Sequence, residues 1–133
     1  MSEENVGIVR RLIEALNRNE QDRVSGILDP EVVIDATRRL VNPMTYTGMQ
    51  GYGRMVAERE EVWEEFRMEP DEVLDAGDRV VAIGRWVGKG KGSGIEVHQP
   101  VADVYTLHDG RVVRAEFGFT DRAEALEAAG LSE

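Results

Sequence analysis

The chain has no cysteine and only two histidines among its 133 residues. A disulfide framework, a thiol nucleophile and a cysteine-based metal site are therefore excluded, and two isolated histidines do not make a zinc site. The glycine-rich run 88–94 lacks the ordered glycine-lysine-hydroxyl string of a phosphate loop, so it predicts a flexible hairpin. We therefore expect no metal and no other cofactor.

Positive charge is also scarce: the chain has 16 lysines and arginines against 26 acidic residues, so its net charge is −10. Such a chain repels phosphate backbones and anionic lipid surfaces, which argues against nucleic-acid and membrane partners. The first residues are acidic where a secretory signal would be basic, and no apolar run is long enough to span a membrane. These features predict a cytoplasmic protein.

The order of apolar periods predicts one α+β domain over residues 1–133. Helical spacing covers 6–16, a shorter helix ends before Asp29 and Pro30, and a third helix covers 52–66, with a loop over 36–51. Alternating patterns then predict strands over 31–35, 67–74, 79–87, 95–107 and 111–119, with a turn at 108–110 and a last helix that Asp121 caps. This order indicates an antiparallel sheet with the helices on one face.

Asp103 is the most informative residue of the second half. Alternate residues from 95 to 107 form the inward row of a strand, and Asp103 is the one acid in that row. A buried carboxylate needs a partner, a raised pKa or a ligand, because an uncompensated buried charge is costly. A pocket at Asp103 is therefore plausible.

The polar residues of the neighbouring strands decide what could meet Asp103. If they share its face, Arg85 approaches from one side and Glu116, with Arg114, from the other. One interpretation is a catalytic pair, Asp103 and Glu116, whose pKa values burial and Arg85 push apart. The alternative is a structural ion-pair network across three strands.

Other residues are candidates for lining a pocket. Tyr46, Tyr52, Trp63 and Tyr105 combine an apolar body with a polar tip, and position favours Tyr105, whereas Tyr52 and Trp63 also fit the core stripe of a helix. Asp35 ends the first strand near the expected mouth, where it could also be a surface acid or a local cap.

The same strand phase predicts an apolar outer face that no helix covers: Val80, Ala82, Trp86, Ala102, Val104, Val113, Ala115, Phe117 and Phe119. A patch of this size is larger than soluble monomers usually expose, and a two-fold axis would bury it against its own copy. We therefore expect a homodimer through this face.

Four segments of the chain, 9–17, 27–32, 75–81 and 109–126, resemble SnoaL-like proteins of the nuclear transport factor 2-like superfamily. The resemblance covers nearly the whole chain. It implies a cone in which a curved sheet wraps around helices and encloses a cavity, with frequent dimerisation, but it does not imply one activity.

The enzymes of this superfamily match the chain only in part. Asp103 matches the neutral carboxylic acid of ketosteroid isomerases, but Leu12 stands where their tyrosine would be and Ala36 aligns with their base. Limonene-type epoxide hydrolases match at Arg85 and Glu116, whereas Val87 replaces their aspartate. SnoaL-like polyketide cyclases need little more than one acid in an apolar cavity.

Three functions follow as hypotheses. The first is a cavity for a small, largely apolar molecule, with isomerase- or cyclase-type proton transfer by Asp103 and Glu116. The second is a non-catalytic ligand-binding or dimerisation module whose inner charges are structural. The third is an epoxide hydrolase-like activity with an incomplete site.

Overall fold

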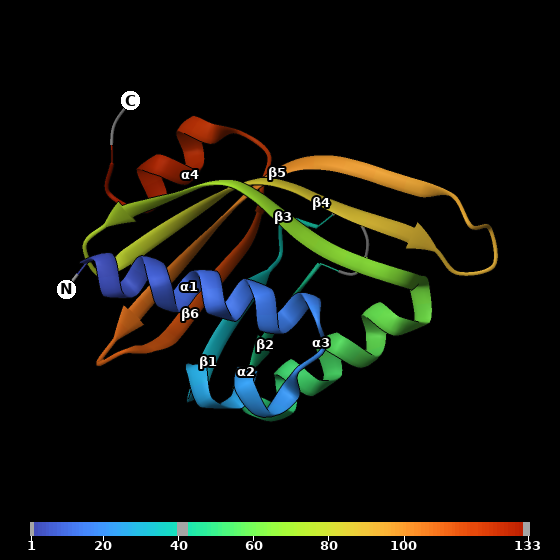
Figure 1. The fold of residues 1–133 in the computed structure, drawn as a ribbon, viewed down its shortest axis with the longest axis horizontal. Helices are drawn as coiled ribbons and strands as arrows, with labels where there is room; N and C mark the ends of the chain where they lie inside the picture. The colour runs from blue at the N-terminus through green and yellow to red at the C-terminus, as the bar shows by residue number, and fades with distance from the viewer. Residues whose placement is uncertain (1, 40–42, 132–133) are drawn as a thin grey trace.

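The computed structural model describes residues 2–39 and 43–131. Figure 1 shows a curved, open sheet with α1 lying across one side and α4 on the other. The elements in chain order are α1 (Ser2–Asn17), α2 (Gln21–Ile27), β1 (Leu28–Ala36), β2 (Met44–Thr47), α3 (Gly48–Val62), β3 (Trp63–Ala76), β4 (Arg79–Gly90), β5 (Glu96–His108), β6 (Arg111–Phe119) and α4 (Arg122–Ala128).

The six strands lie in the order β2-β1-β6-β5-β4-β3. All neighbouring pairs are antiparallel except β1 and β6, which run parallel. The parallel pair is possible because five elements separate β1 from β6 in the chain, whereas adjacent strands joined by short turns must run antiparallel. β5 is therefore a central strand, with β4 and β6 on its two sides.

The main core fills the inner face of the sheet, where α1 and α3 pack. The helices contribute Val9, Leu12, Ile13, Tyr52, Met55 and Val56, and the strands contribute Ile34, Val80, Ala82, Tyr105 and Ala115. A smaller core lies on the outer face, where Ala125, Leu126 and Ala129 of the C-terminal segment cover Val81, Ala102, Val104 and Phe119. The prediction that the helices share one face is therefore wrong for α4.

The predicted apolar outer face is also wrong in part. Val80, Ala82 and Ala115 lie in the inner core and Phe117 packs against it, so these side chains point toward α1 and α3. Of the nine predicted residues, Ala102, Val104 and Phe119 do face outward, and α4 covers them.

The sequence pattern also misplaced the start of β3. Trp63 and Phe66 are three residues apart, which predicts a helix, but α3 ends at Val62. Both side chains belong to β3, where the pairing shifts by one residue between Trp63 and Glu65. This bulge lets two residues at helical spacing share one face of a strand.

The loop expected over 36–51 contains β2 and the start of α3, with residues 40–42 outside the described part. Other local predictions are confirmed. Asp109 and Gly110 have φ angles of 50° and 77° in the β5–β6 turn. The Asp121 carboxylate accepts a hydrogen bond from the Ala123 N–H at 2.8 Å and caps α4. Within the described ranges, no helix combines the length and the apolar character needed to cross a membrane.

Candidate functional site

Asp103 lies near the middle of β5 on the inner face, as the sequence predicts. It is paired with Ala82 of β4, which belongs to the inner core, while its neighbours Ala102 and Val104 belong to the outer core. Only 6% of Asp103 is exposed, and it is the one buried charged residue among those described. The sheet therefore holds a single carboxyl group in an otherwise apolar layer.

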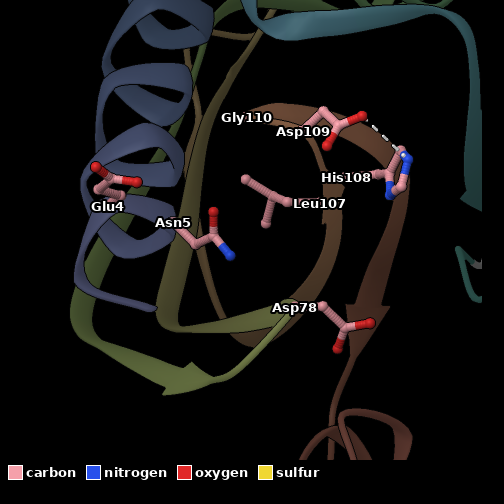
Figure 2. Close-up of a pocket in the computed structure, with 7 residues that line it drawn as sticks. All are labelled: Glu4, Asn5, Asp78, Leu107, His108, Asp109 and Gly110. Carbon is pink, nitrogen blue, oxygen red and sulfur yellow. Dashed lines mark ion pairs between the residues drawn. The ribbon is translucent and has the colours of Figure 1, made fainter. Parts of the chain in front are cut away.

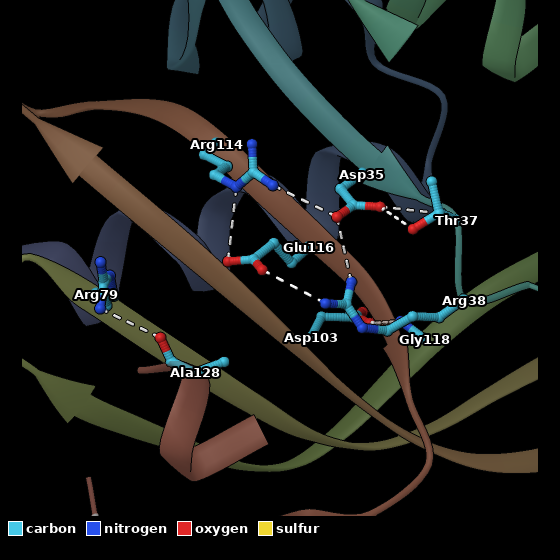
Figure 3. Close-up of polar contacts among 9 residues, drawn as sticks. All are labelled: Asp35, Thr37, Arg38, Arg79, Asp103, Arg114, Glu116, Gly118 and Ala128. Atoms are coloured by element: carbon cyan, nitrogen blue, oxygen red, sulfur yellow. Dashed lines mark hydrogen bonds and ion pairs between the residues drawn. The ribbon is translucent and has the colours of Figure 1, made fainter. Parts of the chain in front are cut away.

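One hydrogen bond reaches this carboxyl group. The Gly118 N–H donates to Asp103 Oδ1 at 3.0 Å (Figure 3). Burial raises the pKa of Asp103 to about 7, and the Gly118 hydrogen bond opposes part of that rise because it favours the ionised form. Tyr105 lies two residues along the same strand, and burial followed by the charge of Asp103 raises its pKa as well.

Gly118 owes its position to a bulge in β6. The β5–β6 pairing runs from Ala102 with Phe119 to Val104 with Glu116, so β6 has one more residue than β5 between these pairs. Gly118 has a φ of 91°, in the region where glycine is favoured. The bulge is what aims this N–H at Asp103. A glycine inside a predicted strand was the sequence signal that could have revealed it.

Arg85 and Glu116 do not join Asp103, so the predicted three-residue cluster is wrong. Between Ala82 and Arg85 the β4–β5 register is regular, which puts Arg85 on the opposite face from Asp103. Its side chain is 48% exposed and pairs with Glu69 at 2.7 Å. Glu116 pairs with Val104 and therefore also faces outward. The register turns both side chains away because a strand alternates faces at every residue.

Glu116 belongs to a charged group on the outer side of β1 and β6. Two arginines bridge two carboxylates there: Arg38 lies 3.4 Å from Asp35 and 3.6 Å from Glu116, and Arg114 lies 3.4 Å from Asp35 and 3.7 Å from Glu116 (Figure 3). The Arg38 guanidinium also stacks on Phe119, 3.9 Å from the ring centroid. Glu116 therefore belongs to an ion-pair network, but one formed with Asp35, Arg38 and Arg114 instead of the predicted Arg85 and Asp103.

Asp35 caps the end of β1 as well as joining that network. Its Oδ1 accepts hydrogen bonds from the Thr37 N–H at 3.0 Å and from the Thr37 hydroxyl at 2.5 Å. Burial alone would raise the pKa of Asp35, but these hydrogen bonds and the charges of Arg38 and Arg114 outweigh it and lower the pKa. Of the roles considered for Asp35, the geometry matches the local cap.

The aromatic candidates fall in three places. Tyr105 is fully buried beside Asp103, and its ring lies 6.0 Å from that of Phe117 in an edge-to-face arrangement. The Tyr46 hydroxyl donates to Glu58 at 2.5 Å and accepts from Arg39 at 2.7 Å, while Tyr52 is buried in α3. Trp63 lies at the other end of the inner face, with Phe66 and Trp86.

A pocket of the described chain lies away from these aromatic candidates. It measures about 590 Å³ and lies between the first turn of α1 and the β5–β6 turn (Figure 2). Its lining is mostly polar: Glu4, Asn5, Asp78, Leu107, His108, Asp109 and Gly110. A second pocket of about 290 Å³ lies beside α3. Asp103 lines neither, and the described residues hold no group of three or more histidine, aspartate or glutamate side chains suited to a metal ion.

Solved structures define the class of fold. An NTF2-like protein of unknown function from Burkholderia pseudomallei is 25% identical, with a TM-score of 0.77 over 93% of this chain and 95% of that one. TerC, co-crystallised with polyporic acid, is 20% identical, with a TM-score of 0.77 over 96% and 98%. A protein from Shewanella denitrificans assigned as a SnoaL-like polyketide cyclase is 16% identical, with a TM-score of 0.72 over 93% and 97%. The curved sheet around helices is thus the NTF2-like fold.

Within that class the family is shown by the sequence itself. The profile of the SnoaL-like domain matches residues 9–115, and the chain belongs to this family. The match includes β5 and therefore Asp103, while the end of β6 and all of α4 lie beyond it. No curated protein matches the chain.

Proposed function

We propose that this SnoaL-like protein binds a small, largely apolar organic molecule on the inner face of its sheet and that Asp103 moves a proton in its conversion, as in a cyclisation or isomerisation. The single observation behind the proposal is the burial of Asp103 among apolar side chains, with one backbone hydrogen bond and a pKa of about 7. No described cation lies within ion-pair distance of this carboxyl group.

A carboxyl group with a pKa near neutrality suits acid–base chemistry. It is present in both protonation states at neutral pH, so it can accept a proton from carbon or oxygen and return it elsewhere on the substrate. Structural carboxylates usually have hydrogen bonds and cation partners that lower their pKa, as the Thr37 hydrogen bonds and the two arginines together do for Asp35. The opposite shift at Asp103 favours a functional role over a structural one.

The proposal now rests on Asp103 without Glu116 or Arg85. Leu12 and Ala36, which stand at the tyrosine and base positions of ketosteroid isomerases, are buried apolar residues of the inner core. A reaction that one carboxyl group can serve fits these surroundings better than one needing three polar groups. The structural neighbour assigned as a polyketide cyclase supports the cyclisation class, and the polyporic acid complex of TerC supports a small organic ligand.

The test is a screen of small apolar carbonyl, enone and epoxide compounds. Compounds that raise the melting temperature are followed by mass spectrometry for conversion, since a ligand specific for the folded state stabilises it by mass action. Asp103→Asn keeps an acceptor for the Gly118 N–H and should still bind while conversion falls at least about a hundredfold. Asp71→Asn, an exposed acid on β3, is the matched control. Unchanged conversion in Asp103→Asn would contradict the proposal.

A non-catalytic binding module is the second candidate, and the outer-face ion network favours it in one respect. Glu116, half of the predicted catalytic pair, is held in ion pairs with Arg38 and Arg114 on the side away from Asp103. Saturable binding without conversion of any compound would support this module.

The homodimer through the outer face stays a prediction. Its basis is weaker than the sequence indicated, because α4 covers part of that face and ion pairs occupy another part. Light scattering at micromolar concentration should give twice the mass of one chain. The mass of a single chain would mean that α4 alone suffices to close the outer core.

A further inference from the structure

Arg59 is a half-buried arginine that lacks an ion pair. It lies in the last turn of α3, and no carboxylate of the described residues lies within 4.0 Å of its guanidinium. Its contacts are the Phe66 ring, 5.2 Å from ring centroid to Cζ, and a long hydrogen bond of 3.4 Å from Nη2 to Asn19 Oδ1. Burial lowers the pKa of Arg59, and the nearby Tyr52 and Glu60 oppose part of that shift.

Each of the other half-buried arginines whose contacts are described has a carboxylate partner or a shorter polar contact than Arg59, and Arg79, which also lacks an ion pair among the described residues, donates to the Ala128 carbonyl at 3.2 Å. Arg67 and Arg114 are also half-buried, and each has a carboxylate partner, Glu69 at 2.6 Å and Asp35 at 3.4 Å. With 26 acidic residues available, a partner for Arg59 would not be scarce. A partly desolvated cation with no carboxylate at ion-pair distance is unfavourable, so its presence needs a reason.

The Phe66 ring that Arg59 contacts belongs to a cluster of three aromatic rings. The Phe66 ring is stacked with Trp86 at 5.4 Å, and Trp63 lies 5.5 Å from Trp86. Trp63 packs directly against the backbone at residue 88 because that residue is glycine, where a Cβ would lie 2.8 Å from the indole. All three rings are half-buried rather than enclosed. Trp86 lies on the same face of β4 as Ala82, the residue opposite Asp103.

We propose that Arg59 and these rings form a subsite for an aromatic carboxylic acid, with the carboxylate on the guanidinium and the ring against the aromatic side chains. A carboxylate matches the planar donor pattern of a guanidinium and would supply the missing counter-charge. A flat ring would stack or pack edge-to-face on the exposed rings. That this ligand is the substrate rests on the proposed function. In that case the subsite would bind the end of the substrate that is remote from the reacting atoms.

The experiment compares 1-naphthoate with its neutral amide, 1-naphthamide, as ligands of the whole chain in calorimetric titrations. The wild type should bind the carboxylate at least about tenfold more tightly than the amide, since a charge-assisted pair adds to the shared ring contact. Arg59→Met should lose that preference and Arg67→Met should keep it. Equal binding of the two compounds by the wild type, or a preference that survives Arg59→Met, would overturn the proposal.

A second measurement separates a binding role from a structural one. Without ligand, Arg59→Met should melt at the same temperature as the wild type or higher, because the substitution removes a desolvated charge and keeps an unbranched apolar chain against Phe66. If Arg59→Met melts lower or fails to fold, Arg59 is structural and the proposal is wrong. Binding of naphthoate should persist in Asp103→Asn, so loss of conversion there would leave this inference standing.

Discussion

Replacing Asp103 by Asn should make the protein more stable at neutral pH and leave it unchanged in acid. The ordinary pKa of an aspartate is 3.8, and burial raises that of Asp103 to about 7 in the folded protein. Between these values the folded protein retains a proton that the unfolded chain has released. The free energy of unfolding therefore falls as pH rises through this window, because the unfolded state binds fewer protons.

The size of the effect follows from the width of the window. Each unit of pKa difference is worth about 1.36 kcal/mol, so a shift of about three units corresponds to about 4 kcal/mol at full deprotonation. That is a large part of the 5–15 kcal/mol typical of a domain. Asn cannot ionise and can still accept the hydrogen bond of the Gly118 N–H, now 3.0 Å from Asp103 Oδ1. Hence the variant should match the wild type near pH 4 and exceed it by about 4 kcal/mol above pH 8.

Urea unfolding at intervals from about pH 4 to about pH 9 measures this difference in the free energy of unfolding, with the fluorescence of Trp63 and Trp86 as the signal. The informative quantity is the difference in the free energy of unfolding between the variant and the wild type. Carboxylates whose pKa is lowered, such as Asp35, make both proteins more stable as pH rises, so their effect cancels in this difference. Asp71→Asn, at an exposed position on β3, is the control for the loss of one acidic side chain. Parallel curves for Asp103→Asn and the wild type would refute the reasoning that burial holds Asp103 protonated.

Three further predictions concern the surroundings of Asp103 and the outer face. Gly118→Ala should lower the free energy of unfolding by about 1–2 kcal/mol because φ is 91° at this residue. It should also raise the pKa of Asp103 further by disturbing the hydrogen bond, which carboxyl-carbon NMR can follow. The control Gly77→Ala, at a φ of 79° in a distant turn, should carry a similar cost without changing the titration of Asp103. Arg85→Ala should lower the free energy of unfolding in urea by less than about 1 kcal/mol, because the side chain is 48% exposed and its ion pair with Glu69 is solvated. A loss above about 3 kcal/mol would mean that Arg85 is part of a buried ion pair after all. Arg38→Ala should lower the free energy of unfolding by about 1 kcal/mol at low ionic strength and by less in molar salt, because salt screens its ion pairs. A loss that salt leaves unchanged would assign the effect to stacking on Phe119 alone.

The inner row of β5 could be predicted from the sequence because alternation is a local property of an extended chain. Asp103, Tyr105 and Leu107 lie on one face at spacings of two, and all three are buried. The first residues of the same row, Ile95 and Val97, are 65% and 37% exposed. They lie where the β4–β5 hairpin extends past the helices (Figure 1). Alternation thus identified the face of each residue, but the length of row that the helices cover depends on how the whole domain packs.

The sequence by itself determined the features that depend on a few neighbouring residues: the burial of Asp103, the Asp109–Gly110 turn and the Asp121 cap. It also determined the family to which the chain belongs. Only the tertiary structure decided what surrounds Asp103, because partners on other strands depend on register. Strands alternate faces at every residue, so an error of one position moves each side chain of a strand to the other side of the sheet. The β6 bulge adds such a position, which turns Glu116 toward Arg38 and leaves the Gly118 N–H as the hydrogen-bond partner of Asp103.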